Sequence, residues 1–129
     1  YAGDGYYDEA NQETSLFVMI ETKEGVDNAR EILAVEGVDG AYIGPSDLSI
    51  AYGVRPGIST GEHLDPVVEE AIDKIVAAGN ATGKVIGMHL MDAAAANRRL
   101  KQGIRMIGLG SEMRFTTAGV TNCFKGVEQ

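Results

Sequence analysis

The sequence predicts a parallel α/β fold in one domain that spans residues 1–129. The first observation behind this class is a repeated alternation of short apolar segments with stretches of helical spacing. The second is the lack of polar alternation within those apolar segments, which is typical of strands buried on both faces of a parallel sheet. The third is the length of 129 residues, which suits a single domain.

Composition excludes several classes of partner. The chain has 11 basic and 19 acidic residues and a net charge of −8, which argues against nucleic acid and against an anionic membrane surface. No apolar segment approaches the ~18 residues of a membrane span. The single cysteine, Cys123, excludes an internal disulfide and a cysteine-cluster zinc site. We therefore expect a reducing, cytoplasmic setting.

The first half of the chain is expected to contain two strands and one helix. The apolar segment 16–20 forms the first strand, and Thr22 caps a helix over residues 23–34 whose apolar positions recur at helical spacing. Residues 40–44 form a short second strand. We expect residues 44–47 to form a loop, because glycine and proline adjoin there.

The second half is expected to begin with a long helix. Asp65 and Pro66 predict its start, since aspartate caps helices and proline is favoured at the first helical position. Gly79 and Gly83 are two candidate ends. The later elements are a strand over 85–90, a helix over 93–102 capped by Asp92, a strand over 104–109, and a helix from Thr116 or Thr117 to about 124. Near the end of the 93–102 helix, Arg98, Arg99 and Lys101 are expected to form a solvated basic face.

Polar residues gather where the expected strands end, namely Glu21, Asp47, His89 and the Ser111–Glu112 pair. That edge is where parallel sheets and barrels bind ligands. Four strand–helix units are half of the eight that close a (β/α)8 TIM barrel of about 250 residues. With a polar lead-in over residues 1–15, the sequence predicts half of such a barrel, or a longer protein seen in part.

Glu21 and Asp47 are the candidate metal ligands. Each follows a buried strand, so both carboxylates are expected at one mouth of the sheet. Two converging carboxylates repel, and a hard divalent cation such as Mg²⁺ or Mn²⁺ relieves that repulsion. The alternative is that Glu21 caps the next helix and Asp47 caps a turn.

The segment from Gly44 through Pro45 and Ser46 to Asp47 is a candidate substrate-binding loop. Glycine allows a ligand to approach the backbone, and the amides of Ser46 and Asp47 are placed to receive a small carboxylate. The alternative is an ordinary turn. His89 is a candidate base, although a lone strand histidine is more often a packed, hydrogen-bonded residue.

Residues 17–22 and 37–49 closely resemble the HpcH/HpaI aldolase family, the class II metal-dependent pyruvate aldolases. The resemblance rests on the separation of Glu21 from Asp47 and on the Gly-Pro-Ser-Asp-Leu-Ser string. It covers nearly the whole chain and is most specific in the first 50 residues. It implies a (β/α)8 barrel of which this chain supplies about strands five to eight.

The resemblance also implies a site and a reaction. Glu21 and Asp47 would hold Mg²⁺ or Mn²⁺, with Co²⁺ or Zn²⁺ as alternatives, and pyruvate would chelate this ion beside Gly44, Pro45 and Ser46. A 4-hydroxy-2-oxo acid would be cleaved to pyruvate and an aldehyde through a pyruvate enolate that the metal stabilises. The family's catalytic histidine and substrate-binding arginine lie in the first half of the barrel, so the isolated chain is expected to lack them.

Two departures and two alternatives accompany this interpretation. Met19 stands where the family often has glutamine, and Glu112 stands where it often has aspartate. The alternatives are a citrate-lyase β-like acyl-CoA lyase, which has a similar glutamate–aspartate pair, and a catalytically incomplete half-barrel. The Gly-Pro-Ser-Asp string favours the pyruvate aldolases. The family further implies a homo-oligomer, commonly a hexamer, that exchanges C-terminal helices between subunits.

Overall fold

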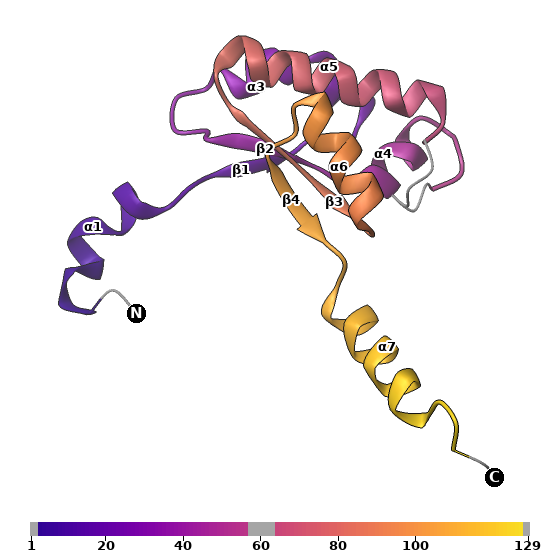
Figure 1. Cartoon of the computed structure of the whole chain (residues 1–129). Helices are drawn as coiled ribbons and strands as arrows, with labels where there is room; N and C mark the ends of the chain where they lie inside the picture. The colour runs from indigo at the N-terminus through magenta and orange to yellow at the C-terminus, as the bar shows by residue number, and fades with distance from the viewer. Residues whose placement is uncertain (1–2, 57–63, 128–129) are drawn as a thin grey trace.

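The fold is a four-stranded parallel sheet with helices packed against one face (Figure 1). The computed structural model describes residues 3–56 and 64–127. The strands lie side by side in chain order, and every neighbouring pair is parallel. They are β1 (Phe17–Met19), β2 (Gly40–Ile43), β3 (Val85–Leu90) and β4 (Met106–Leu109). The α/β class is confirmed, while closure into an eight-stranded barrel stays a prediction.

The helices form a compact group over the sheet and two outlying segments. The described helices are the 3-10 helix η1 (Gly3–Gly5), α1 (Tyr6–Glu13), α2 (Lys23–Asp27), α3 (Ala29–Leu33), α4 (Pro45–Ala51), α5 (Pro66–Thr82), α6 (Ala93–Gln102) and α7 (Glu112–Phe124). Helices α1 and α7 extend away from the body (Figure 1) and bury none of their residues. Along the described part of the chain, no helix combines the length and hydropathy needed to cross a membrane.

Several predicted helix boundaries are confirmed by their capping hydrogen bonds. The Thr22 side chain accepts from the Gly25 amide at 3.0 Å, and the Asp65 side chain accepts from Val67 at 3.1 Å. Asp92 caps α6 in the same way. Of the two candidate ends of α5, the structure selects Gly83, whose φ of 69° lies in the left-handed region that favours glycine.

Three sequence predictions about helices were wrong. The helix expected over 23–34 is two helices that meet at Asn28, whose side chain donates to the Glu24 carbonyl at 2.9 Å. The loop expected over 44–47 is the first turn of α4, because Pro45 occupies the first helical position. The last helix starts at Glu112 rather than at Thr116 or Thr117, since Ser111 caps it.

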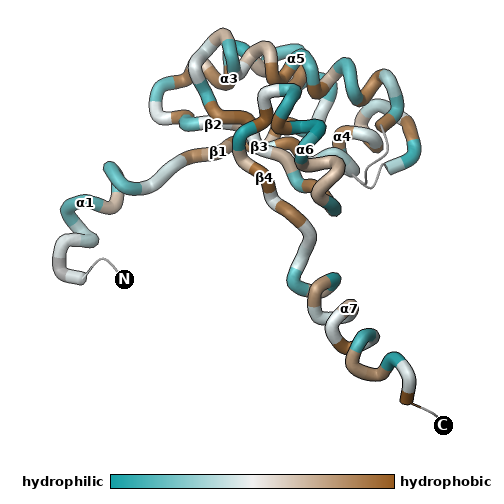
Figure 2. The backbone as a smooth tube through the Cα atoms, in the orientation of Figure 1, coloured by the Kyte–Doolittle hydropathy of each residue, from teal (hydrophilic) through white to brown (hydrophobic). Residues whose placement is uncertain are grey.

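The sheet has one covered face and one open face. Ala41, Ile43 and Met88 alternate toward the helices and are fully buried, as period-two geometry requires. On the opposite face Met19, Val85 and Met106 are 56%, 41% and 42% exposed. Figure 2 shows hydrophobic colour along the strands. The open face therefore presents apolar side chains of the kind that fill a barrel interior.

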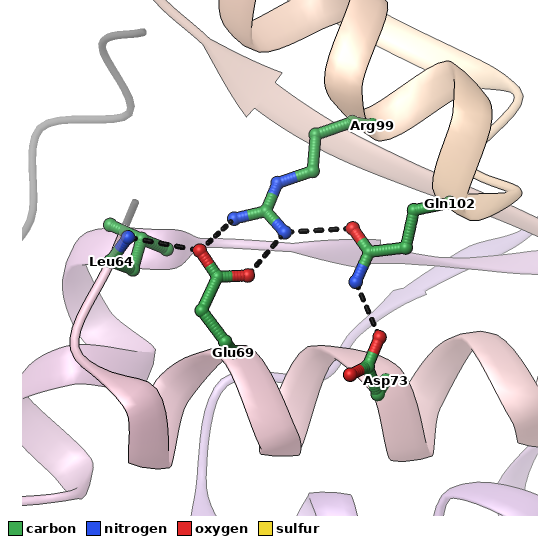
Figure 3. A network of polar contacts seen from close by, with 5 residues as sticks. All are labelled: Leu64, Glu69, Asp73, Arg99 and Gln102. Carbon is green, nitrogen blue, oxygen red and sulfur yellow. Dashed lines mark hydrogen bonds and ion pairs between the residues drawn. The ribbon is translucent and has the colours of Figure 1, made fainter. Parts of the chain in front are cut away.

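A buried ion pair joins α6 to α5 (Figure 3). The Arg99 side chain is 1% exposed and donates to both carboxylate oxygens of Glu69, at 2.6 and 3.0 Å. Arg99 also donates to Gln102, which in turn donates to Asp73. The Leu64 amide donates to Glu69 at 2.9 Å. The prediction that Arg99 belongs to a solvated basic face was therefore wrong, because this side chain of α6 packs against α5 and pairs with Glu69.

The electrostatics of Glu69 follow from this network. Burial alone would raise the pKa of the Glu69 carboxyl. The hydrogen bonds and positive charge of Arg99, together with the Leu64 amide, outweigh burial and hold that pKa below its usual value.

Candidate metal and substrate site

The carboxyl ends of β1 and β2 bring Glu21 and Asp47 together beside Gly44. Met19 of β1 pairs with Tyr42 of β2 in the parallel sheet. Glu21 and Gly44 each follow two residues later, so they lie opposite each other and on the same open face as Met19 and Tyr42. A side-chain carbon at Gly44 would overlap the Oε2 atom of Glu21 and lie 3.5 Å from the Oδ2 atom of Asp47. Both carboxylates therefore converge on one point at the sheet edge, as the strand-end pattern predicts.

The Oε2 atom of Glu21 is buried and accepts no hydrogen bond from the described residues. A buried carboxylate oxygen without a donor costs free energy, and a cation can remove that cost. Within residues 3–56 and 64–127, no group of three or more histidine, cysteine, aspartate or glutamate side chains forms a metal site. The donor set is therefore two carboxylates, which suits a hard divalent ion that takes its other ligands from water and substrate.

The segment 44–47 forms the start of α4 rather than a free loop. Gly44 is the N-cap residue with extended backbone, and its carbonyl accepts from the Leu48 amide at 2.9 Å. The buried Ser49 hydroxyl donates to the Pro45 carbonyl at 2.7 Å and holds the first turn in place. Amides in a first turn point out beyond the helix start, where the dipole favours negative charge. Carboxylate binding by this turn stays a prediction.

A cavity of about 570 Å³ opens at this edge of the sheet. Its lining residues are Met19, Tyr42, Gly44, Pro45, Ser46, Asp47, His89, Met91 and Arg114. The predicted segment 44–47 and His89, near the end of β3, therefore line the same cavity. Glu21 is not among the lining residues, but its carboxylate lies next to Gly44. Glu112, the other strand-end acid, does not line the cavity.

Tyr42 is a cavity residue that the sequence interpretation missed. Its ring lies over Gly87 of β3 and its hydroxyl lies at Gly108 of β4, since a side-chain carbon at either glycine would overlap it. The pKa of the Tyr42 phenol is raised, because burial outweighs the hydrogen bond from the Gly108 backbone. The available signal was two glycines in neighbouring strands, which leave room for one large ring.

Arg114 is the second missed cavity residue. It lies in the first turn of α7, where its amide donates to the Ser111 hydroxyl at 3.4 Å. The sequence interpretation started this helix later and so placed Arg114 in a loop with no role. The Ser-x-x-Arg spacing after a strand end was the available signal, because serine is a favoured N-cap.

Comparison with known proteins places the chain among aldolases and citrate lyases. A family model described as HpcH/HpaI aldolase/citrate lyase matches residues 3–118. The chain is 37% identical over 123 residues to a 5-keto-4-deoxy-D-glucarate aldolase of Klebsiella pneumoniae, a match that covers 93% of this chain and 46% of that protein. The chain thus spans about half the length of this relative.

Solved structures give the same result. An HpcH/HpaI aldolase/citrate lyase family protein from Burkholderia cenocepacia is similar, with a TM-score of 0.81 and 29% identity over 95% of this chain and 46% of its own. An HpcH/HpaI aldolase from Desulfitobacterium hafniense has a TM-score of 0.75 and 28% identity over 95% of this chain and 47% of its own. Both similarities again involve about half of the longer protein.

Proposed function

The chain belongs to the HpcH/HpaI aldolase/citrate lyase family, and from that membership we propose that it forms the metal-binding half of a pyruvate aldolase. In this proposal β1 to β4 are strands five to eight of a TIM barrel. The exposed apolar face with Met19, Val85 and Met106 supports it, because a barrel interior needs a second half to cover it. The match to the Klebsiella relative also supports this proposal, because it covers only 46% of that longer protein.

The observation that carries the proposal is the buried, unbonded Oε2 of Glu21 next to Asp47. These two carboxylates would hold Mg²⁺ or Mn²⁺, with Co²⁺ or Zn²⁺ as alternatives. When bound, such an ion polarises a keto oxygen and stabilises negative charge that develops there. Gly44 leaves open the space into which the carboxylates converge, since any side chain at this position would fill it.

The substrate end of the site consists of backbone rather than side chains. We assign the carboxylate of a 2-oxo acid to the first turn of α4, at the amides of Ser46 and Asp47. Pro45 presets the backbone of this turn, and the Ser49 hydroxyl holds it. The apolar side chains of Met19 and Met91 line the cavity beside this turn, where the carbon chain of the substrate would lie.

The proposed reaction is the cleavage of a 4-hydroxy-2-oxo acid. The proton of the 4-hydroxyl is removed, the bond between C3 and C4 breaks, and its electron pair stays on the pyruvate fragment as the aldehyde leaves. The relative's description as a 5-keto-4-deoxy-D-glucarate aldolase supports this class of reaction. We assign the base to no residue of this chain, and His89 remains a cavity-lining residue.

Metal titration and a half-reaction test the proposal in the full-length protein. Glu21→Gln and Asp47→Asn should each weaken Mn²⁺ binding by about tenfold or more, because a neutral amide offsets no metal charge. Both should also slow the exchange of pyruvate methyl protons with D₂O, which reports proton removal without any aldehyde. Glu24→Gln, at an exposed position of α2, is the matched control.

Two outcomes would count against the proposal. Unchanged Mn²⁺ affinity in both variants would remove the metal assignment. Cleavage of acyl-CoA substrates by a wild-type protein that leaves 4-hydroxy-2-oxo acids intact would favour the citrate-lyase-like alternative.

A further inference from the structure

Two polar side chains of the cavity lining, Tyr42 and His89, lie against the same glycine of β4. A side-chain carbon at Gly108 would overlap the Tyr42 hydroxyl and would lie 3.4 Å from the Nδ1 atom of His89. Tyr42 comes from β2 and its ring lies over Gly87 of β3, whereas His89 comes from β3 itself. The absence of a side chain at Gly108 therefore leaves one space that both polar groups border.

His89 lies on the open face of the sheet, at the same level as the two carboxylates. The residues on either side of His89 in β3 are fully buried toward the helices, so His89 belongs to the opposite face. The register of β2 and β3 places Gly44 beside His89. One strand spacing, about 4.8 Å, therefore separates the backbone of His89 from the glycine at which Glu21 and Asp47 converge. A ligand that extends along the sheet from this point would meet His89.

The hydrogen-bonding capacity of Tyr42 indicates what it does for His89. The phenol oxygen accepts a hydrogen bond from the Gly108 backbone, and its pKa is raised, so the phenol keeps its own proton at neutral pH. A hydroxyl that accepts one hydrogen bond still has its proton to donate to a second partner. When the Nδ1 atom of a neutral imidazole accepts such a bond, the ring proton is held on Nε2.

We propose that Tyr42 is a positioning residue that donates to Nδ1 of His89, directly or through one water, and that His89 donates from Nε2 to the oxygen of the departing aldehyde. In the cleavage direction this oxygen is the 4-hydroxyl, which gains negative charge as its proton leaves. A donor that is oriented beforehand stabilises that charge. His89 transfers no proton in this step, and the base stays unassigned. This inference rests on the proposed aldolase function, because it assigns a contact to the part of the substrate that leaves.

Nitrogen-15 NMR of the full-length protein with Mg²⁺, at about pH 8 where an ordinary imidazole is neutral, reads the tautomer without turnover. The His89 signals are those that disappear in His89→Gln. Wild type should carry the ring proton on Nε2, and Tyr42→Phe should show a mixture of both tautomers, since Nδ1 has lost its donor. Tyr52→Phe, which removes a phenol hydroxyl outside the cavity lining, should leave the signals unchanged. A proton on Nδ1 in wild type, or an unchanged spectrum in Tyr42→Phe, would overturn the pairing.

The addition of pyruvate to glycolaldehyde tests the contact between His89 and the substrate. His89→Leu should lower kcat/KM for glycolaldehyde by about tenfold or more, because it removes the donor. Mn²⁺ affinity and pyruvate proton exchange should stay within about twofold, since both report the metal end of the site. His89→Gln should retain most of the activity, because its side-chain amide also offers an N–H donor. Tyr42→Phe should fall between wild type and His89→Leu.

The proposed function and the role of His89 fail in different ways. If wild type neither exchanges pyruvate protons nor adds pyruvate to glycolaldehyde, the aldolase function and the substrate contact are both overturned, and the NMR spectrum alone decides the pairing of Tyr42 with His89. If exchange is normal and His89→Leu keeps the wild-type kcat/KM for glycolaldehyde, the role of His89 is overturned while the aldolase function stands. A parallel loss of Mn²⁺ affinity in His89→Leu would show a structural role and would also overturn the contact.

Discussion

Gly44 lies so close to Glu21 that a side-chain carbon at this glycine would overlap the buried Oε2 of the glutamate. The relationship follows from the register of β1 and β2, which places Glu21 opposite Gly44. The absence of a side chain at residue 44 thus sets the space in which the two carboxylates converge.

Gly44→Ala should therefore weaken Mn²⁺ binding and raise KM for pyruvate, because the new methyl group displaces Glu21. The backbone of Gly44 is extended, with φ of −89°, so alanine fits it without backbone strain. Gly119→Ala is the matched control, since a side-chain carbon at Gly119 meets no atom within 4 Å. Manganese titration of both variants checks this, and an unchanged affinity in Gly44→Ala would contradict it.

Ser46→Ala should change KM for pyruvate by no more than about twofold. The first turn of α4 offers backbone amides, which alanine retains, and helix starts bind anions through such amides. Steady-state kinetics in the aldol direction measure the effect. A large loss in Ser46→Ala would show that the hydroxyl, rather than the backbone, binds the carboxylate.

Arg99→Met should destabilise the fold by roughly 3 kcal/mol, because it leaves the Glu69 carboxylate at the α5–α6 contact without its partner. Lys101→Met, at an exposed position on the same helix, should have a much smaller effect. Urea unfolding of the two variants provides the comparison. Equal stabilities would mean that solvent, rather than Arg99, satisfies Glu69.

The Glu69 pair should also make stability depend on pH. The pKa of Glu69 is lower in the folded protein than in the unfolded chain, where it is about 4.3. Its contribution is therefore present in full above that unfolded pKa and is lost as the pH falls through the folded pKa. The stability advantage of wild type over Glu69→Gln should shrink between pH 6 and about 3, as measured by urea unfolding at each pH. A pH-independent difference would contradict this.

Helix α7 should take part in assembly between subunits. Its apolar side chains Met113, Phe115 and Phe124 are each more than half exposed, and the helix extends away from the body (Figure 1). Replacing Phe115 and Phe124 by serine should lower the oligomeric state in sedimentation, since apolar surface of this kind associates. Thr121→Ser is the control on the same helix. A wild-type protein that sediments as a monomer would contradict the expectation.

Much of the fold was predictable because local chemistry dictates it. The capping aspartates Asp65 and Asp92 mark helix starts with their own side chains, and the structure contains both hydrogen bonds. The start of α4 was missed because glycine and proline signal a turn and a helix start equally well. Only burial of Leu48 and Ser49 against the body decides for the helix.

The candidate site likewise has some features that the sequence predicts and others that only the tertiary structure shows. The strand-end positions of Glu21 and Asp47 follow from sequence alone, because the carboxyl ends of parallel strands share one edge. Sequence could not show that Glu21 Oε2 is buried without a donor, that Arg99 is paired inside the protein, or that Tyr42 and Arg114 reach the cavity. Those facts depend on strand register and helix packing, which join residues far apart in the chain. The sequence by itself therefore determined the order of elements and the chemistry at the strand ends, and tertiary structure decided which side chains meet, because burial and contact exist only after distant segments pack.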